Sequence, residues 1–403
     1  MTKFFKKCNN YYRLGEPTLA KKTGIYPYFH LISGEQNTIV QMDDNEVIMM
    51  GSNNYLGMTT HPKIKQAAKE AIDQYGAGST GSRLLNGTME LHVELEERLA
   101  RFIGKEDCVV FSTGMQTNLG GISSLLSEKD EWIISDQQNH ASIIDGIRLG
   151  KNNKENKCIY NHNDTEDLKR YLKEIPKGKA LIVTDGVFSM EGDIAKLDEI
   201  VELAEDYNAG VYVDDAHSVG VLGDNGKGTA NHFNLTDKVD ITMGTFSKSF
   251  ATIGGFIAAS KQICNWIRHK ARAFVFSASP PPASCATVIA ILDLIEKDDS
   301  YRQNLLAVAK RMKEGLVELG FDTGESTTPI IPLVVGGQNK TLRFFKKLFE
   351  NKPRGIFTNP ILQPATPKGR ELIRTSYIST MTNEIVDEAL DILEKVGKDM
   401  KLI

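Results

Sequence analysis

The feature of this sequence that most constrains its fold is an alternation of amphipathic helical segments with short apolar runs, between about residues 60 and 290. Residues 61–75 and 88–103 each place apolar side chains on one helical stripe. The apolar runs are continuous, which is typical of strands buried on both faces of a mainly parallel sheet. They comprise residues 108–111, 132–134, 180–183, 211–213 and 256–259. The sequence therefore predicts an α/β fold with a mainly parallel sheet.

The pattern changes after about residue 290. Helical stretches at roughly 284–319 and 383–400 bracket short apolar runs such as 330–335, which is typical of a smaller α+β domain. We therefore expect an N-terminal arm over residues 1–59, a large domain over 60–290 and a small C-terminal domain over 291–403. The polar segment 151–157 is expected to be a loop.

The composition argues against several classes of protein. The chain has 48 Lys and Arg against 52 Asp and Glu, a formal net charge of −4, so we expect no nucleic-acid partner, which usually meets a strongly basic surface. No run approaches the roughly 18 apolar residues that span a bilayer, and no apolar stretch follows the basic N-terminus, so no secretory signal is expected. The five cysteines are scattered and odd in number, which indicates reduced thiols in the cytoplasm.

The first residues leave two alternatives open. Phe4 and Phe5 lie beside lysines at positions 3, 6 and 7. Such a start is either a solvated helical turn or a short amphipathic segment that touches a membrane surface.

Polar clusters follow the predicted strands directly, at residues 112–114, 135–140, 184–186 and 214–217. In parallel sheets the ligand crevice lies beyond the carboxyl ends of the strands. We therefore expect the functional site at this edge.

A glycine pattern upstream is misleading. Gly76, Gly78 and Gly81 match the dinucleotide-binding spacing G-x-G-x-x-G. That fingerprint requires a strand before it and a helix opening at it, whereas here an amphipathic helix precedes it. A tight loop is the better interpretation.

Lys248 follows an apparent strand at residues 240–243 and is flanked by Thr245 and Ser247. An imine-forming lysine needs a desolvated site, and neighbouring hydroxyls can bind the phosphate of its cofactor. Asp214 could hold a pyridinium nitrogen protonated, and His217 could donate to a phenolate oxygen. The alternatives are a solvated loop at Lys248 and a helix cap with a structural histidine at Asp214 and His217. Asp-x-x-His is also a conceivable metal spacing, but no third ligand is evident nearby.

Four further residues fit a site for pyridoxal 5'-phosphate (PLP) and its substrate. Gly114 and Met115 lie at a strand-to-helix turn, where backbone amides and the helix dipole favour a phosphate. His140 could stack on the cofactor ring, or be structural. Arg374 lies in an apolar strand-like stretch and is either a carboxylate-binding residue or a salt-bridged surface arginine.

Along nearly its whole length the chain resembles the α-oxoamine synthase family of PLP enzymes, of fold type I. The resemblance rests on several motifs in the family's order. They are Asn53-Asn54-Tyr55-Leu56-Gly57, Gly78-Ser79-Thr80-Gly81-Ser82-Arg83, Asn139-His140-Ala141-Ser142, residues 185–190, residues 214–218 and Thr245-Phe246-Ser247-Lys248.

The resemblance implies a role for each matching residue. Lys248 would be the imine lysine and an acid/base, with His140, Asp214 and His217 as its catalytic partners. The residues that would hold cofactor are Gly114, Met115, His140, Ser189, Asp214, His217, Thr245, Ser247 and Lys248, with Ser277 and Ala278 approaching the cofactor of the partner in a homodimer. Asn53 and Arg374 would meet the amino-acid carboxylate.

Within the family the chain is most similar to members that condense L-serine with a long-chain acyl-CoA, giving 3-ketosphinganine, CoA and CO2. Four segments support this branch, at residues 51–58, 81–87, 139–146 and 276–281. The usual Ala-Thr-His-Thr segment is here Ser379-Thr380-Met381-Thr382, a departure on the small-domain side of the substrate pocket. The alternatives are an enzyme that uses glycine, alanine or cysteate with another acyl-CoA, and a non-catalytic subunit of the same fold.

Overall fold

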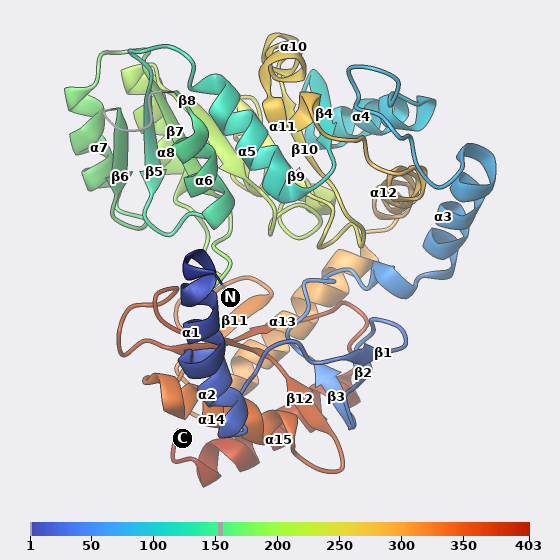
Figure 1. The fold of residues 1–403 in the computed structure, drawn as a ribbon, viewed down its shortest axis with the longest axis vertical. Coiled ribbons are helices and arrows are strands. Elements are labelled where there is room, and N and C mark those ends of the chain that lie inside the picture. Colours follow the sequence, from blue (N-terminus) through green and yellow to red (C-terminus); the bar gives the residue numbers. More distant parts are fainter. Residues whose placement is uncertain (1, 152–155) are drawn as a thin grey trace.

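The structure is a computed structural model that describes residues 2–151 and 156–403. Most of the polar segment 151–157 thus lies outside the described residues. Figure 1 shows an upper body built on a large sheet and a lower body that contains the C-terminus and from which the N-terminal arm extends.

The upper body is built on a sheet of seven described strands, in the order β4-β10-β9-β8-β7-β5-β6. They are β4 (Asp107–Phe111), β10 (Gly255–Ala259), β9 (Ile241–Thr245), β8 (Gly210–Asp214), β7 (Ala180–Asp185), β5 (Trp132–Asp136) and β6 (Lys157–Tyr160). β10 runs antiparallel to β4 and β9, and the other neighbours are parallel. The predicted α/β class with a mainly parallel sheet is confirmed.

Helices cover both faces of this sheet. Ile133 and Ile134 are successive residues of β5 and pack into different cores, because side chains alternate across a strand. One face packs on α5 (Gly114–Leu125), α6 (Ala141–Leu149), α10 (Lys261–Lys270) and α11 (Arg272–Val275). The other packs on α7 (Thr165–Glu174), α8 (Leu197–Tyr207), α9 (Thr229–His232), α4 (Glu90–Ile103) and α12 (Pro282–Ile295), and α3 (Pro62–Tyr75) lies against α12. Burial on both faces explains the continuous apolar runs.

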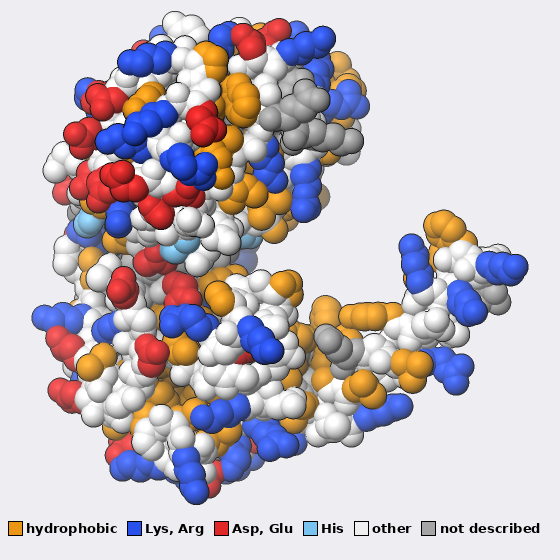
Figure 2. Space-filling model, turned by 90° about the vertical axis from the view of Figure 1, so that its left-hand side faces the viewer, with side chains coloured by type: hydrophobic (Ala, Val, Ile, Leu, Met, Phe, Trp, Pro, Cys, Tyr) orange, Lys and Arg blue, Asp and Glu red, His pale blue; other side chains and the backbone are white. Residues whose placement is uncertain are grey.

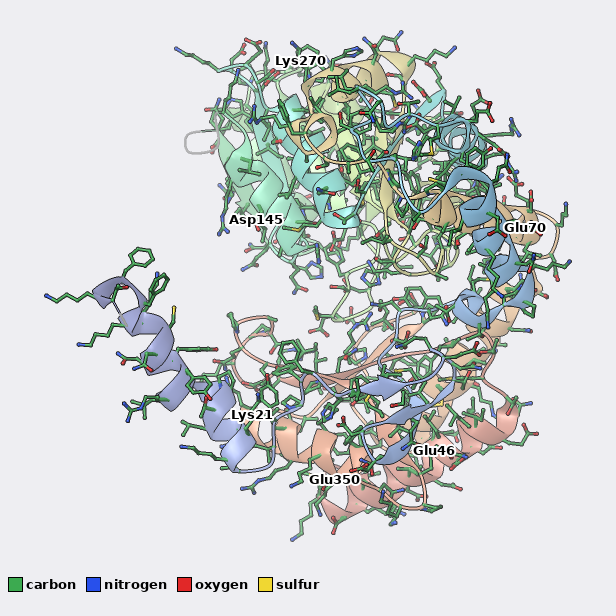
Figure 3. All side chains as sticks on the ribbon, turned by 45° about the vertical axis from the view of Figure 1, so that its right-hand side comes forward. Lys21, Glu46, Glu70, Asp145, Lys270 and Glu350 are labelled. Atoms are coloured by element: carbon green, nitrogen blue, oxygen red, sulfur yellow. The ribbon has the colours of Figure 1, made fainter. Side chains whose placement is uncertain are left out.

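The lower body contains two smaller sheets. One has the order β1-β2-β3-β12 and the other, antiparallel, the order β11-β14-β13. The strands are β1 (Ile32–Ser33), β2 (Ile39–Met42), β3 (Asn45–Met49), β12 (Gly355–Phe357), β11 (Ile330–Val334), β14 (Leu372–Ser376) and β13 (Asn359–Ile361). The helices of this body include α13 (Ser300–Glu318), α14 (Gln338–Phe349) and α15 (Asn383–Asp399). Among the residues described in either body or in the arm, the 3-10 turns are η1 (Lys3–Phe5), η2 (Met58–Thr60) and η3 (Asp224–Gly226). Figure 3 shows Glu46, on β3, and Glu350, just after α14, in this same lower body.

The helical stretch predicted over 284–319 is two helices. α12 ends at Ile295, and α13 begins at Ser300, where the Asp298 carboxylate accepts the Ser300 N–H at 2.9 Å. Aspartate favours helix starts because its side chain satisfies free backbone amides. The division at residues 59/60 and 290/291 stays a prediction. β3 pairs in parallel with β12, so part of the N-terminal segment shares a sheet with residues 355–357.

The N-terminal arm carries α1 (Lys6–Leu14) and α2 (Glu16–Lys22). Figure 2 shows basic and hydrophobic side chains on an arm that projects from the body, and Figure 3 shows Lys21 on it. Within the described ranges, no helix is both long and apolar enough to cross a membrane. All five cysteines are described and unpaired.

Candidate active site

A cavity of about 320 Å³ lies where the ends of β4, β5, β7, β8 and β9 meet. It is lined by Thr113, Gly114, Met115, Asn118, His140, Ser142, Asp185, Val187, Asp214, Ala216, His217, Met243, Thr245, Ser247, Lys248, Ile253 and Gly254. The expectation that the polar clusters after the strands converge at one sheet edge is confirmed. The glycine pattern at residues 76–81 lies between α3 and α4, after a helix rather than a strand.

Lys248 lies in the loop after β9, beside two hydroxyls. Thr245 Oγ1 donates to Gly254 O at 3.1 Å and lies 3.0 Å from Ser247 Oγ. Burial lowers the pKa of Lys248 to about 8, although the nearby carboxylates Asp214 and Asp185 favour the charged amine. A substantial fraction of this amine is therefore neutral near physiological pH, which suits a nucleophile or a base.

The carboxylate of Asp214, at the end of β8, is held on both oxygens. Asn118 Nδ2 donates to Oδ2 at 2.6 Å, and the Ala216 N–H donates to Oδ1 at 3.0 Å. Asn118 is itself fixed, because it accepts from the Tyr212 hydroxyl at 2.8 Å and donates to Ser142 Oγ at 2.8 Å. Asp214 is 4 % exposed, so these donors stabilise and orient a buried negative charge.

His140 begins α6 and has a defined tautomer. The Ser142 N–H donates to Nδ1 at 3.2 Å, and Ser142 Oγ lies 2.7 Å from the same nitrogen. Nε2 therefore carries the ring proton. Desolvation lowers the pKa of His140, against the opposing charge of Asp214, so the ring is neutral over the usual working range.

Asp185 also lies in the cavity wall, where β7 and β8 place it opposite Asp214. Burial and the charge of Asp214 raise the pKa of Asp185 well above its ordinary range. Asp185 Oδ1 has no hydrogen-bond partner among the described residues. The neutral form of Asp185 is therefore favoured beside the charged Asp214.

A second cluster, next to this cavity, surrounds Arg374 of β14. Arg374 Nε donates to Ser189 O at 2.5 Å and Nη2 donates to Asn53 Oδ1 at 3.0 Å. Nη2 also lies 3.4 Å from the Tyr55 hydroxyl, which is 2.7 Å from His217 Nδ1. Arg374 is 4 % exposed, so it is not the surface arginine of the alternative interpretation.

His217 connects the two clusters. Burial, with the charges of Lys248 and Arg374, holds the pKa of His217 well below its usual value. The imidazole is therefore neutral, and its one ring proton is available either to Tyr55 or to a ligand in the cavity.

The structure thus brings most of the predicted site residues together, but not all in one place. Gly114, Met115, His140, Asp214, His217, Thr245, Ser247 and Lys248 line the cavity, and Asn53, Ser189 and Arg374 form the neighbouring cluster. Ser277 and Ala278 do not line the cavity. Ser277 accepts from Gln116 Nε2 at 2.9 Å, and Ala278 forms an isolated bridge with Ser82. The roles of these residues stay predictions.

Sequence reasoning missed Asn118, Ser142, Tyr55 and Asp185. The position of Asp185 in the sequence could have indicated it, because Asp185 is the last residue of β7 just as Asp214 is the last residue of β8. Tyr55 and Ser142 lie inside the quoted motifs. Asn118 follows Gly114 by four residues on α5, the spacing that places two residues on one helix face.

The residues present fit PLP. The amides of Gly114 and Met115 lie in the first turn of α5, ahead of the first intrahelical bond, and can meet a phosphate with the Thr245 and Ser247 hydroxyls. A Cβ on Gly114 would lie 2.6 Å from Thr245 Oγ1, so only glycine leaves this turn open. The unpaired Asp185 Oδ1 leaves an acceptor in the wall. No cluster of three or more His, Cys, Asp or Glu in the described chain is placed to hold a metal ion.

Comparison with known proteins assigns the family. Residues 45–393 match the model of the family described as aminotransferase class I and II. The serine palmitoyltransferase of Sphingobacterium spiritivorum is 45% identical over 384 residues, covering 95% of this chain and 94% of that protein. The 8-amino-7-oxononanoate synthase of Treponema denticola is 46% identical over 385 residues, covering 95% and 96%.

A solved structure gives the same result for the fold. The serine palmitoyltransferase of S. paucimobilis, a variant with PLP and myriocin bound, superposes with a TM-score of 0.93 at 33% identity, over 99% of this chain and 100% of that one. The buried Lys248, the hydrogen-bonded Asp214 carboxylate and the match over nearly the whole length all indicate the same family. The chain belongs to the aminotransferase class I and II family and, within it, to the α-oxoamine synthase group of PLP-dependent, acyl-CoA-condensing transferases.

Proposed function

We propose that this enzyme condenses L-serine with a long-chain acyl-CoA, giving 3-ketosphinganine, CoA and CO2. A bond forms between serine Cα and the acyl carbonyl carbon, the CoA thiolate leaves, and the serine carboxyl group departs as CO2. The observation that carries the proposal is the buried Arg374, which is joined through Tyr55 to His217 in the wall of the lysine-containing cavity. A buried guanidinium beside a PLP cavity fits the carboxylate of an α-amino acid.

Different residues of the chain bind the amino acid, hold the cofactor and move the proton at Cα. Arg374 and Asn53 bind and orient the amino-acid carboxylate. PLP, when bound, supplies the electron sink for breaking the Cα–H bond, and Asp214 keeps the pyridine nitrogen protonated. Lys248, whose pKa is about 8, accepts and returns the proton at Cα. A base so placed contributes roughly 10²–10⁴-fold to the rate.

The relatives support two candidate reactions. The serine assignment is supported by the Sphingobacterium relative and by the extent of the match to the S. paucimobilis enzyme. The second candidate, an 8-amino-7-oxononanoate synthase type of reaction, is supported by the equally similar Treponema relative. Met381, 7 % exposed and just before α15, stands where the family commonly carries histidine. It lines a separate groove with Ser379 and Thr382 and not the lysine-containing cavity, so this departure does not choose between the two candidates.

The test is a screen of the purified PLP-loaded enzyme. L-serine, L-alanine, glycine and L-cysteate are each combined with palmitoyl-CoA and with pimeloyl-CoA, and products are detected by mass. The proposal expects 3-ketosphinganine from serine and palmitoyl-CoA at a kcat/KM at least tenfold above the other pairs. A larger value for alanine with pimeloyl-CoA would refute it. Lys248→Ala is the control and should lose turnover by at least 10²-fold.

We also propose a homodimer, in which Ser277 and Ala278 approach the cofactor of the partner. The support is apolar surface at the cavity: Met115 and Ile253 line it, yet are 42 % and 53 % exposed, and Phe276 is 72 % exposed. Such a patch beside a ligand site is typical of an interface. Light scattering of the holoenzyme should give twice the chain mass, and Phe276→Asp should weaken the dimer. A monomeric active enzyme would contradict this.

A further inference from the structure

His162, just after β6, lies between two carboxylates. Its Nδ1 is 3.0 Å from Asp136 Oδ1 and its Nε2 is 2.8 Å from Asp193 Oδ2. A carboxylate only accepts, so both ring nitrogens carry protons in this arrangement and the ring is an imidazolium. The Asp136 side chain has no exposed surface, and that of Asp193 is 20 % exposed. The three groups therefore form a charged bridge with limited access to water.

This bridge fixes the segment between β7 and α8, residues 186–196. The His162 ring packs edge-on against Phe188 at a centroid distance of 4.4 Å. The Phe188 N–H donates to Asp193 O at 3.0 Å, which closes the segment into a turn. Asn163 Nδ2 donates to Asp193 Oδ2 at 2.9 Å and to Ile194 O at 3.2 Å. The histidine thus holds both ends of a turn that has Ser189 between them.

The same turn touches the lower body at two places. Ser189 O accepts from Arg374 Nε at 2.5 Å, which sets the plane of the guanidinium and leaves Nη2 for Asn53. Gly192 O accepts from Thr328 Oγ1 at 2.8 Å and from Ser326 Oγ at 3.2 Å. The Nε side of Arg374 is therefore oriented by a backbone carbonyl whose position depends on the turn, while its other guanidinium nitrogens contact Asn53, Tyr55 and Ser376.

We propose that His162 is a positioning residue for amino-acid binding: through Asp193 and Phe188 it holds the Ser189 carbonyl, which orients Arg374 toward the amino-acid carboxylate. The inference deepens the proposed function and rests on Arg374 as the carboxylate site. A guanidinium that loses this carbonyl keeps its charge but is oriented less precisely, so bidentate capture of a carboxylate is weakened. A misdirected binding group affects amino-acid affinity more than the later chemistry.

The charged surroundings agree with a cationic ring. The groove beside His162 is lined by the titratable side chains Glu191, Asp193, Lys196, Asp322, Glu325 and Arg370, and Asp136 lies behind the ring. Burial opposes the charge, but hydrogen bonds to Asp136 and Asp193 outweigh it and raise the pKa of His162 to about 9. The acidic groups outnumber the basic ones, so the bridge is charged at neutral pH.

The test compares ligands with and without a carboxylate. His162→Gln removes the cation, and His232→Gln, an exposed histidine on α9, is the matched control. Dissociation constants for the PLP-loaded enzyme are measured by absorbance titration with L-serine and L-alanine, and with the amines serinol and isopropylamine. We expect His162→Gln to weaken both amino acids about tenfold, both amines less than twofold, and kcat less than threefold, with no change in His232→Gln.

A double-mutant cycle with Arg374→Lys separates positioning from general structure. Because His162 acts through Arg374, His162→Gln should weaken amino-acid binding no further in that background. Equal weakening of amines and amino acids, additive effects, or no weakening would each overturn the inference. If Arg374→Lys alone leaves amino-acid binding unchanged, the proposed carboxylate site fails instead. If His162→Gln does not fold, Asp193→Asn replaces it in the same titrations. The results expected for Asp193→Asn, and the results that would overturn the inference, are those given for His162→Gln.

Discussion

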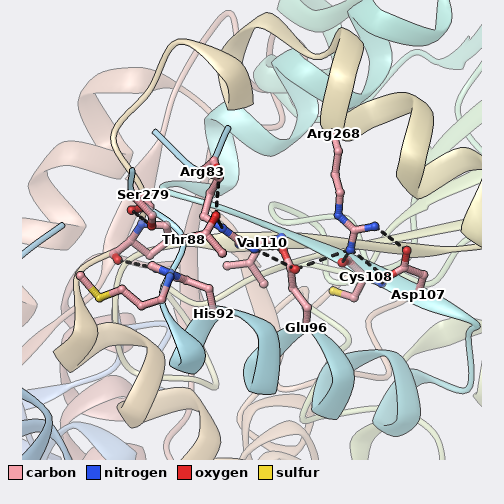
Figure 4. A network of polar contacts seen from close by, with 12 residues as sticks. Arg83, Thr88, His92, Glu96, Asp107, Cys108, Val110, Arg268 and Ser279 are labelled. Carbon is pink, nitrogen blue, oxygen red and sulfur yellow. Dashed lines mark hydrogen bonds and ion pairs between the residues drawn. The ribbon is translucent and has the colours of Figure 1, made fainter. Parts of the chain in front are cut away.

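Replacing Glu96 of α4 by leucine is expected to lower the free energy of unfolding by about 3–5 kcal/mol, the cost of leaving one partner of a buried ion pair alone. Figure 4 shows the network. Arg83 donates to the two Glu96 oxygens at 2.8 and 3.0 Å, and both side chains are 7 % exposed. Glu96 Oε1 also accepts the Val110 N–H of β4 at 2.9 Å.

The size of this loss in unfolding free energy follows from the groups that lose Glu96 as a hydrogen-bond or ion-pair partner. Arg83 stays charged in a site that water hardly reaches. The Val110 amide loses its side-chain acceptor, which by itself costs about 1–3 kcal/mol. Arg268 lies 3.5 Å from Glu96 but keeps its two bonds to Asp107, so it adds little. The buried methyl groups of leucine offset a part of this, which keeps the total within the stated range.

The double variant Arg83→Met/Glu96→Leu is expected to be much closer to wild type than either single variant, because no charge is left buried. Urea unfolding of the apoprotein, followed by circular dichroism, gives the midpoints. Glu97→Leu, an exposed glutamate on the same helix, is the matched control and should stay within about 0.5 kcal/mol. A loss below about 1 kcal/mol for Glu96→Leu, or a double variant equal to the sum of the singles, would refute the reasoning.

Three further outcomes are expected. Gly114→Val should weaken PLP binding at least tenfold, because a Cβ would lie 2.6 Å from Thr245 Oγ1; reconstitution of the apoenzyme measures this, and wild-type affinity would contradict it. Tyr55→Phe should cost about 1–3 kcal/mol of unfolding free energy, since His217 Nδ1 loses its partner; urea midpoints check it. The pKa of His162 is raised to about 9 in the folded chain. Protonated His162 therefore stabilises the fold fully below its pKa in the unfolded chain, near 6.5, and this stabilisation is lost as pH rises through about 9. Between about pH 6.5 and pH 9 the difference in unfolding free energy between wild type and His162→Gln should therefore shrink. The upper limit of this decrease is about 3 kcal/mol, and the partial exposure of the ring to solvent reduces it. A difference that stays constant with pH would exclude the charged bridge.

Much of the fold and the centre of the site could be predicted from the sequence alone. The alternation of helical stripes and apolar runs located α3, α4 and most strands of the large sheet. Lys248, Asp214 and His140 could be brought together without coordinates, because the carboxyl ends of neighbouring parallel strands meet at one edge. The motifs gave the family resemblance, which the comparisons confirmed.

Only the tertiary structure decided the rest. The reversed direction of β10 and the pairing of β3 with β12 join segments that no local pattern relates, the second pair lying about 300 residues apart. The hydrogen bond from Asn118 to Asp214 and the position of His162 between Asp136 and Asp193 are equally invisible in the sequence. Helix and strand periodicity reports which face of an element is buried. Which polar group on that face meets which partner depends on how the elements pack, and this is set by the whole chain.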